Sequence, residues 1–266
     1  MQIPSLPPEI LDYITGFLRD EPDTLRECCL VAKSWIPRTR KYLFANILFR
    51  SEDDLKSWKT VFPDSANSPA HHTRTLFVDC ADTGVMANAE ETGWIRAFSG
   101  VTRLELDSNL PYIYPEVSLV PFYNFSPTLK SLHAHSLILP SPQLFTLVLS
   151  FPLLEDLTVN GFYTGQPDDH DDPHTTAPST SPPLTGTLGL GIGRGMGDTA
   201  RKLLDLPNGL HFRRLIFSLT CRRQDARWIM KLLMGCSNTL ECLDVTCNVR
   251  RKLILCAGAT LPLPPG

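Results

Sequence analysis

A short apolar pattern recurs along the last two thirds of this 266-residue chain, and it restricts the possible folds more than any other feature. In its full form two leucines stand three positions apart and an apolar residue follows two positions later, as in Leu154-x-x-Leu157-x-Val159. Full or nearly full copies begin at Thr73, Val101, Leu129, Leu154, Phe212 and Leu240, and a looser copy is Leu188-x-Leu190. The central leucine returns every 25 to 31 residues. A period of this length predicts stacked supersecondary units.

Segments with helical periodicity lie between several copies of the pattern. The helix candidates are residues 88–98, 141–151, 198–206 and 223–236. Alternation of strands and helices predicts an α/β fold class. The pattern resembles an irregular leucine-rich repeat, and this resemblance implies a solenoid over residues 73–266, in which each unit contributes one short parallel strand and one return helix.

The residue after each central leucine should point away from the core of such a solenoid, because side chains alternate along a strand. A target protein would most naturally contact this outward row. Its members are Glu105, His133, Thr158, Ile216 and Asp244. We treat them as a hypothetical target-binding surface.

Residues 5–48 predict three short helices before the repeats begin. The stretch Leu6-Pro7-Pro8-Glu9 is typical of a helix start, because proline is tolerated in the first turn and an acidic residue there favours the helix dipole. After a break, we expect Asp23 or Thr24 to cap a second helix, with Glu27 completing a capping box. A third helix follows after a further break.

This N-terminal region carries more apolar residues than it can bury. They are Leu6, Ile10, Leu11, Ile14, Phe17, Leu18, Leu25, Cys29, Leu30, Val31, Trp35 and Ile36. A unit of this size is close to the lower limit for an independent core. The surplus must therefore cover either the rest of the chain or another protein.

The same region resembles an F-box of the kind common in mushroom-forming fungi. The family pattern L-P-x-E-[IL]-L, followed by a further aliphatic residue and then by L…C-x-V-[CS]-[KR]-x-W, matches a dozen positions in order. They are Leu6, Pro7, Glu9, Ile10, Leu11, Ile14, Leu18, Leu25, Cys29, Val31, Lys33 and Trp35. The resemblance implies an F-box over residues 1–50, and we expect a linker at 51–72 before the repeats.

The resemblance also implies a partner and a role. F-boxes bind a Skp-family adaptor, which connects them to a cullin-RING scaffold, so the chain would be the substrate-recognition subunit of an SCF-type ubiquitin ligase. The adaptor-binding residues that the resemblance implies are Leu6, Pro7, Ile10, Leu11, Ile14, Leu18, Leu25, Leu30, Val31 and Trp35. The target itself would be an unknown protein.

The sequence contains no recognisable catalytic, metal-binding or nucleotide-binding motif. Residues 164–184 are rich in Pro, Ser, Thr and Asp and predict a loop inserted between repeats. The spacing of the Asp and His residues in this stretch fits neither an EF-hand nor a zinc motif. The glycines of residues 186–197 lack the G-x-G-x-x-G spacing and indicate close backbone approach or a turn. We expect no metal, no cofactor and no enzymatic activity.

Charge is distributed unevenly and leaves one alternative open. Residues 61–193 carry a net charge of −10 and residues 194–266 a net charge of +7. A nucleic-acid binder could use the basic residues of the last third, although aromatic residues are not interleaved with them. Those residues are Arg201, Lys202, Arg213, Arg214, Arg222, Arg223, Arg250, Arg251 and Lys252.

A second alternative is a repeat-based interaction protein whose N-terminal helices only cap the repeats and have no connection to a ligase. No secretory signal or membrane-spanning run is visible, and the eight cysteines form no C-x-x-C pair. We therefore expect an intracellular protein with reduced thiols, in the cytoplasm or the nucleus.

Overall fold

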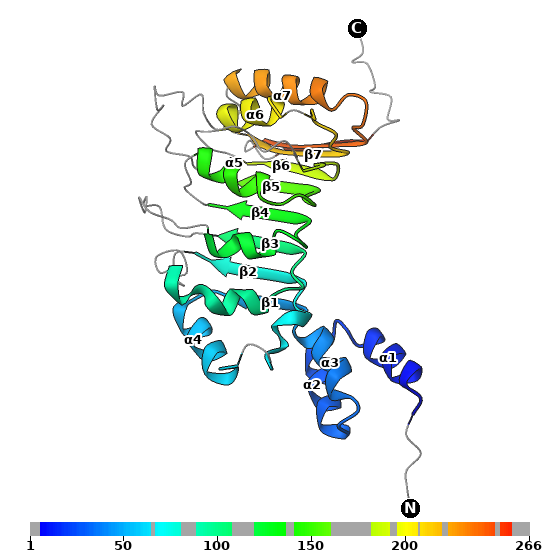
Figure 1. Ribbon diagram of the computed structural model, residues 1–266. Helices are drawn as coiled ribbons and strands as arrows, with labels where there is room; N and C mark the ends of the chain where they lie inside the picture. The colour runs from blue at the N-terminus through cyan, green and yellow to red at the C-terminus, as the bar shows by residue number, and fades with distance from the viewer. Residues whose placement is uncertain are drawn as a thin grey trace, which may run out of the picture.

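Strands form at every copy of the repeated apolar pattern (Figure 1). They are β2 (Thr75–Asp79), β3 (Arg103–Asp107), β4 (Ser131–His135), β5 (Asp156–Asn160), β6 (Thr187–Leu190), β7 (Arg214–Leu219) and β8 (Cys242–Cys247). The structure, a computed structural model, describes residues 6–64, 67–80, 89–107, 120–136, 141–160, 182–191, 196–206, 208–219, 223–247 and 251–256. The predicted strands are confirmed, including the one at the looser copy.

The strands pair in chain order, so each unit places its strand beside the preceding one. Within the described residues the sheet runs from β1 (Asn46–Phe49) to β9 (Arg251–Cys256) without a change of order. Strands β1 to β8 pair in parallel, and β9 pairs antiparallel with β8. Parallel neighbours require a crossover, which the segments between the strands supply. The α/β fold class is confirmed.

Two rows of apolar side chains cross the sheet and form the core. The register sets each central leucine beside the next one, so equivalent side chains stack from strand to strand. The first row is fully buried and consists of Leu76, Leu104, Leu132, Leu157, Leu188 and Leu215. The second row, two residues further along each strand, consists of Val78, Leu106, Ala134, Val159, Leu190 and Phe217. The two-residue period of a strand turns both rows to the same face.

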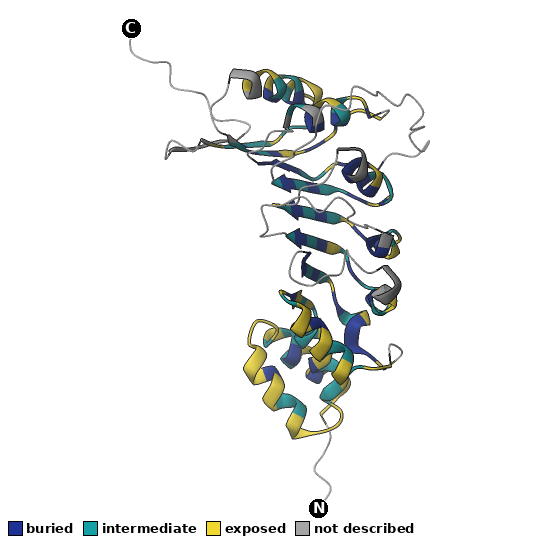
Figure 2. Ribbon diagram, turned by 90° about the vertical axis from the view of Figure 1, so that its left-hand side faces the viewer, coloured by how far each residue is buried: buried dark blue, intermediate teal, exposed yellow. Residues whose placement is uncertain are grey.

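Helical segments cover the face that carries these rows (Figures 1 and 2). They are η2 (Ala89–Ala97), η3 (Val120–Phe125), α5 (Ser141–Leu149), α6 (Met196–Leu204) and α7 (Arg223–Gly235). The helices expected at 141–151, 198–206 and 223–236 are confirmed. The candidate at 88–98 is instead mainly a 3₁₀ helix.

The 3₁₀ geometry fits the apolar spacing of two of these segments. Side chains three residues apart lie on the same side of a 3₁₀ helix. Ile95 in η2 and Phe98 directly after it are separated in this way, as are Phe122 and Phe125 in η3, and all four are fully buried. The aromatic residues at 122 and 125 therefore serve the core.

The segment expected as a linker, 51–72, contains α4 (Glu52–Val61) and η1 (Pro69–His72). Helix α4 starts where the Asp54 N–H donates to the hydroxyl of Ser51 at 3.3 Å. Its Trp58 makes edge contacts with Phe44 and Phe49 at centroid distances of 6.0 and 5.8 Å. These contacts join the segment to the first strand.

The N-terminal region folds into α1 (Pro8–Phe17), α2 (Pro22–Val31) and α3 (Ile36–Leu43), as predicted. The start of α2 differs from the prediction. Glu21 is the N-cap, and no side chain accepts a hydrogen bond there, so the expected Thr24–Glu27 capping box does not form. Pro22 starts the helix earlier because its fixed φ suits the first helical position.

Among the described residues, none of the helices is both long and apolar enough to cross a bilayer. Cysteines 28, 29, 80, 236 and 242 are free thiols.

Candidate protein-interaction surfaces

Helix α1 is apolar on two faces. The inner face buries Leu11, which is 4% exposed, and Thr15, which is fully buried. The outer face carries Leu6 at the residue before the cap and then Ile10, Tyr13 and Phe17. These four are 48%, 46%, 76% and 82% exposed. Their spacings of four, three and four residues place them along one side of the helix, and we call them the α1 stripe.

A second exposed apolar pair ends helix α2. Leu30 is 86% exposed and Val31 is 69% exposed. The inner side of the same helix buries Leu25 completely and keeps Cys28 and Cys29 half-buried. The described fold therefore leaves uncovered part of the apolar surplus noted in the sequence. Exposed apolar surface of this kind is typical of partner-binding sites.

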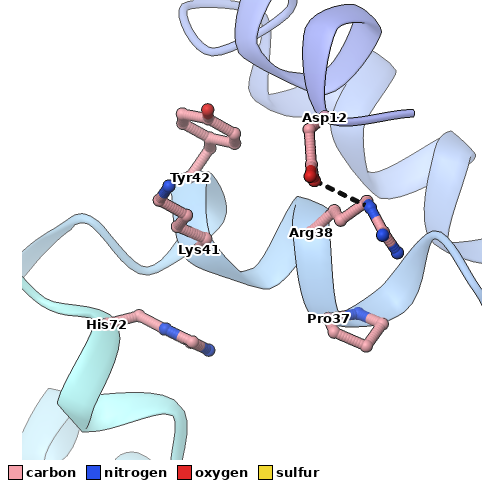
Figure 3. A pocket seen from close by; sticks show the side chains of 6 residues that line it. All are labelled: Asp12, Pro37, Arg38, Lys41, Tyr42 and His72. Carbon is pink, nitrogen blue, oxygen red and sulfur yellow. Dashed lines mark ion pairs between the residues drawn. The ribbon is translucent and has the colours of Figure 1, made fainter. Parts of the chain in front are cut away.

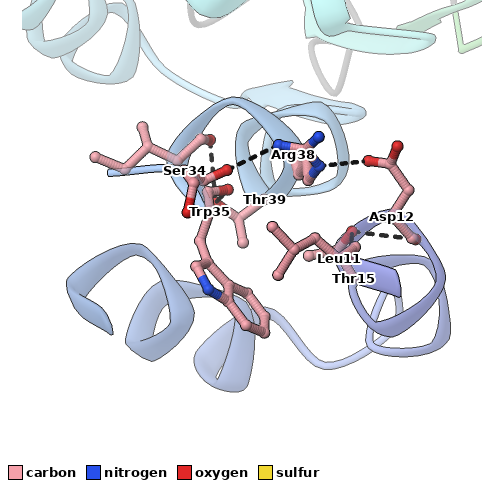
Figure 4. Close-up of polar contacts among 8 residues, drawn as sticks. Leu11, Asp12, Thr15, Ser34, Trp35, Arg38 and Thr39 are labelled. Atoms are coloured by element: carbon pink, nitrogen blue, oxygen red, sulfur yellow. Dashed lines mark hydrogen bonds and ion pairs between the residues drawn. The ribbon is translucent and has the colours of Figure 1, made fainter. Parts of the chain in front are cut away.

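One ion pair joins α1 to α3, and two buried threonine hydroxyls bond within their own helices (Figure 4). Nε of Arg38 lies 2.7 Å from Oδ1 of Asp12, which joins the two helices. The buried hydroxyl of Thr15 donates to the Leu11 carbonyl at 2.8 Å. The buried hydroxyl of Thr39 likewise lies 3.0 Å from the Trp35 carbonyl. These bonds leave both threonine hydroxyls satisfied inside the helical unit.

The predicted adaptor-binding residues divide into three groups by burial. Exposed are Leu6, Pro7, Ile10, Leu30 and Val31. Partly buried are Ile14, Leu18 and Trp35, and buried are Leu11 and Leu25. The last two hold the helical unit together and are not accessible to a partner. The prediction omitted Tyr13 and Phe17, whose helical spacing from Ile10 could have revealed them.

The other candidate surface is the helix-free face of the sheet, which is the face that no helical segment of the described residues covers. The register brings the predicted target-binding residues into one row across neighbouring strands, with Gly189 between Thr158 and Ile216. Glu105, His133, Thr158 and Ile216 are half-buried. Asp244 differs, since it is only 5% exposed. It lies between β7 and the unpredicted strand β9, so it is not at the accessible end of the sheet.

Gly189 of β6 and Gly191 directly after this strand leave room for side chains of β5. A side chain at Gly189 would place its Cβ 2.8 Å from the hydroxyl of Thr158, which leans over it from β5. Gly191 similarly lies under the side chain of Asn160. The sequence predicted close backbone approach or a turn here, and the structure places side chains of the neighbouring strand against both glycines.

His133 lies in the middle of this row and stays neutral at physiological pH. Burial lowers its pKa to about 4, and the cation of Arg103 acts in the same direction, while Glu105 opposes it. Nε of Arg103 forms an ion pair with Oε1 of Glu105 at 2.7 Å. The row therefore presents a neutral imidazole beside a paired carboxylate, a surface suited to hydrogen bonding rather than to attracting charge.

We predict that His133 contributes to acid sensitivity. Its pKa is about 4 in the folded chain and about 6.5 when unfolded, so the unfolded chain binds an extra proton between these values. Stability should therefore fall as the pH is lowered from 6.5 to 4. Urea denaturation at pH 7 and pH 5 should show a smaller loss for His133→Asn than for the wild type. Equal losses in both proteins would contradict the assignment.

The basic residues of the last third are distributed over different elements. Arg201 and Lys202 lie on α6, where the Lys202 ammonium is 5.8 Å from the ring centroid of Phe145. Arg213 and Arg214 lie at the start of β7, and Nε of Arg213 is 3.9 Å from Oε1 of Glu241. The other members of the predicted set are Arg222, Arg223, Arg250, Arg251 and Lys252, whose side chains lie outside the described part. The described members therefore belong to α6 and to the start of β7.

Most of the acidic stretch 164–184 also lies outside the described residues, so its predicted loop remains a prediction.

Comparison with known protein families, curated proteins and solved structures finds no match to this chain.

Proposed function

We propose that the chain is the F-box subunit of an SCF-type ubiquitin ligase. In this proposal α1 to α3 bind a Skp-family adaptor, and the sheet with its return helices is a leucine-rich-repeat-like solenoid that binds a target protein. The observation that carries the proposal is the α1 stripe. A small helical unit that leaves Tyr13 and Phe17 more than three quarters exposed on one helix side has an apolar surface for a partner to bury.

The proposed mechanism is positional. The chain would hold a target with one surface and the adaptor with the other, which raises the effective concentration of a target lysine near the ubiquitin carrier bound to the scaffold. No catalytic residue is assigned to this chain and no cofactor is required. The role places it inside the cell, in the cytoplasm or the nucleus.

The target surface would be the row on the helix-free face. Glu105 and Arg103 are paired, His133 is neutral, and Ile216 adds apolar area on β7. This composition fits a target segment that binds through hydrogen bonds and apolar contacts. It does not favour a strongly charged partner.

In the rival interpretation the N-terminal helices only cap the repeats and have no connection to a ligase. Hydrogen bonds between the helical unit and the sheet favour this interpretation. The Arg74 and Thr75 N–H groups both donate to the Ala45 carbonyl, so the end of the helical unit is bonded to the second strand. The rival predicts that no adaptor binds.

Assembly of the complex tests the proposal. The purified chain is mixed with a Skp-family adaptor, a cullin and a RING subunit and passed over a gel-filtration column. Co-elution of all four proteins is expected, together with loss of the cullin from the chain's fractions when the adaptor is left out. Separate elution of a folded chain and the other subunits would overturn the proposal and leave the cap interpretation.

A further inference from the structure

A pocket lies where the N-terminal helices meet the first segment of the sheet region. Its volume is about 400 Å³. The lining residues come from α1, α3 and η1 and are Asp12, Pro37, Arg38, Lys41, Tyr42 and His72. Figure 3 shows the His72 imidazole extending from η1 towards α3, with Lys41 and Tyr42 on the facing helix. This volume lies within the range found for small-molecule sites.

The pocket has an excess of positive charge. Asp12 is its one acidic lining residue, and this carboxylate is already paired with Arg38 at 2.7 Å. Nη1 of Arg38 is also used, since it donates to the Ser34 carbonyl at 2.9 Å. The other lining residues whose nitrogens can carry a positive charge are Lys41 and His72. Neither has a carboxylate partner among the described residues.

Further cations surround these two groups. Burial lowers the pKa of His72, and His71, Arg40, Arg74 and Lys41 lower it further by charge repulsion. No carboxylate contributes to that shift. Within the described part of the chain, Arg40, Lys41 and Arg74 form no ion pair; Arg74 uses one guanidinium nitrogen to donate to the Gly100 carbonyl at 3.1 Å. Uncompensated cations around a hollow create a positive potential that attracts anions.

We propose that this pocket binds the phosphoryl group of a small soluble molecule. The Lys41 ammonium would supply charge, and a ring N–H of His72 would donate a hydrogen bond to a phosphate oxygen. The bound anion would in turn favour the protonated imidazole. Pro37 and the Arg38–Asp12 pair close the opposite side. The ligand would bridge α3 and η1 and thereby stabilise the orientation of the helical unit on the sheet region. This site does not depend on the proposed ligase role.

The titration of His72 is the direct test. NMR follows the His72 imidazole of the intact chain against pH in sodium chloride and in sodium phosphate at equal ionic strength. Bound phosphate places an anion beside the imidazole and offsets the repulsion by the nearby cations. The pKa of His72 should therefore rise by at least about half a unit in phosphate. An identical titration in both salts overturns the proposal.

A matched pair of variants shows whether the effect belongs to this pocket. Lys41→Gln removes the lining charge, and we expect phosphate to bind at least about fivefold more weakly, which is about 1 kcal/mol. Lys33→Gln removes another exposed lysine, from the neighbouring turn, and should leave phosphate binding unchanged. Circular dichroism confirms that both variants fold. Equal weakening by both variants would indicate general charge attraction and would also overturn the proposal.

Discussion

Replacing Leu132 with alanine should lower the free energy of unfolding by about 3–5 kcal/mol. Leu132 is fully buried in the middle of the first apolar row, between Leu104 and Leu157. Its truncation leaves a cavity that the stacked leucines on both sides cannot fill, because the strand register fixes their positions. Urea denaturation followed by circular dichroism measures the change.

The matched control is Leu153→Ala. Leu153 is 45% exposed in the turn before β5, so its truncation should change the free energy of unfolding by less than about 1 kcal/mol. If Leu132→Ala were as stable as Leu153→Ala, the apolar rows would not be the core of this fold.

The double variant Ile10→Ala, Phe17→Ala should weaken adaptor binding by about 30- to 1000-fold, or about 2–4 kcal/mol. Both side chains belong to the α1 stripe, and their exposure means that truncation removes partner contacts without opening a cavity in the helical unit. Surface plasmon resonance with immobilised adaptor measures the affinity, and a thermal scan checks that the unfolding midpoint stays within about 3 °C of the wild type.

Two further variants make this result specific. Met230→Ala, Met234→Ala removes two exposed apolar side chains from α7, 57% and 63% exposed, and should leave adaptor binding unchanged. Leu11→Ala, one residue from Ile10 but buried, should instead destabilise the helical unit. Adaptor binding that is insensitive to the α1 stripe, or equally sensitive to the α7 pair, would contradict the assignment of this surface.

The repeat pattern predicted the sheet well for two reasons. Its two-residue alternation marks the strands, and its recurrence every 25 to 31 residues marks the length of each repeat. Leucines at positions such as 104, 132 and 157 define which residues face the core, and their spacing defines which strands are neighbours. The row from Glu105 to Ile216 followed from the same logic. The burial of Asp244 did not, because it depends on β9, which carries no copy of the pattern.

Strand β1 escaped prediction for a local reason. Asn46 follows the end of α3 after two residues, with no glycine or proline to separate helix from strand. The segment therefore reads as a continuation of an apolar helix. Only pairing with β2 makes it a strand, and this long-range contact leaves no signal in the local sequence.

The exposed surface of the N-terminal helices could be predicted only in part. Ile10 and Leu11 are both apolar and differ by one residue, or about 100° around the helix. Which of them turns inward depends on α3, through contacts such as the Asp12–Arg38 ion pair. Sequence spacing revealed two apolar faces of α1 but not which one the fold would bury.

Titration of a purified Skp-family adaptor into the intact chain by calorimetry tests the central claim most directly. We expect one-to-one binding with a dissociation constant below about 1 µM, equivalent to about −8 kcal/mol. No binding by the folded wild-type chain at adaptor concentrations up to about 50 µM would contradict it, since the affinity would then be weaker than about −6 kcal/mol.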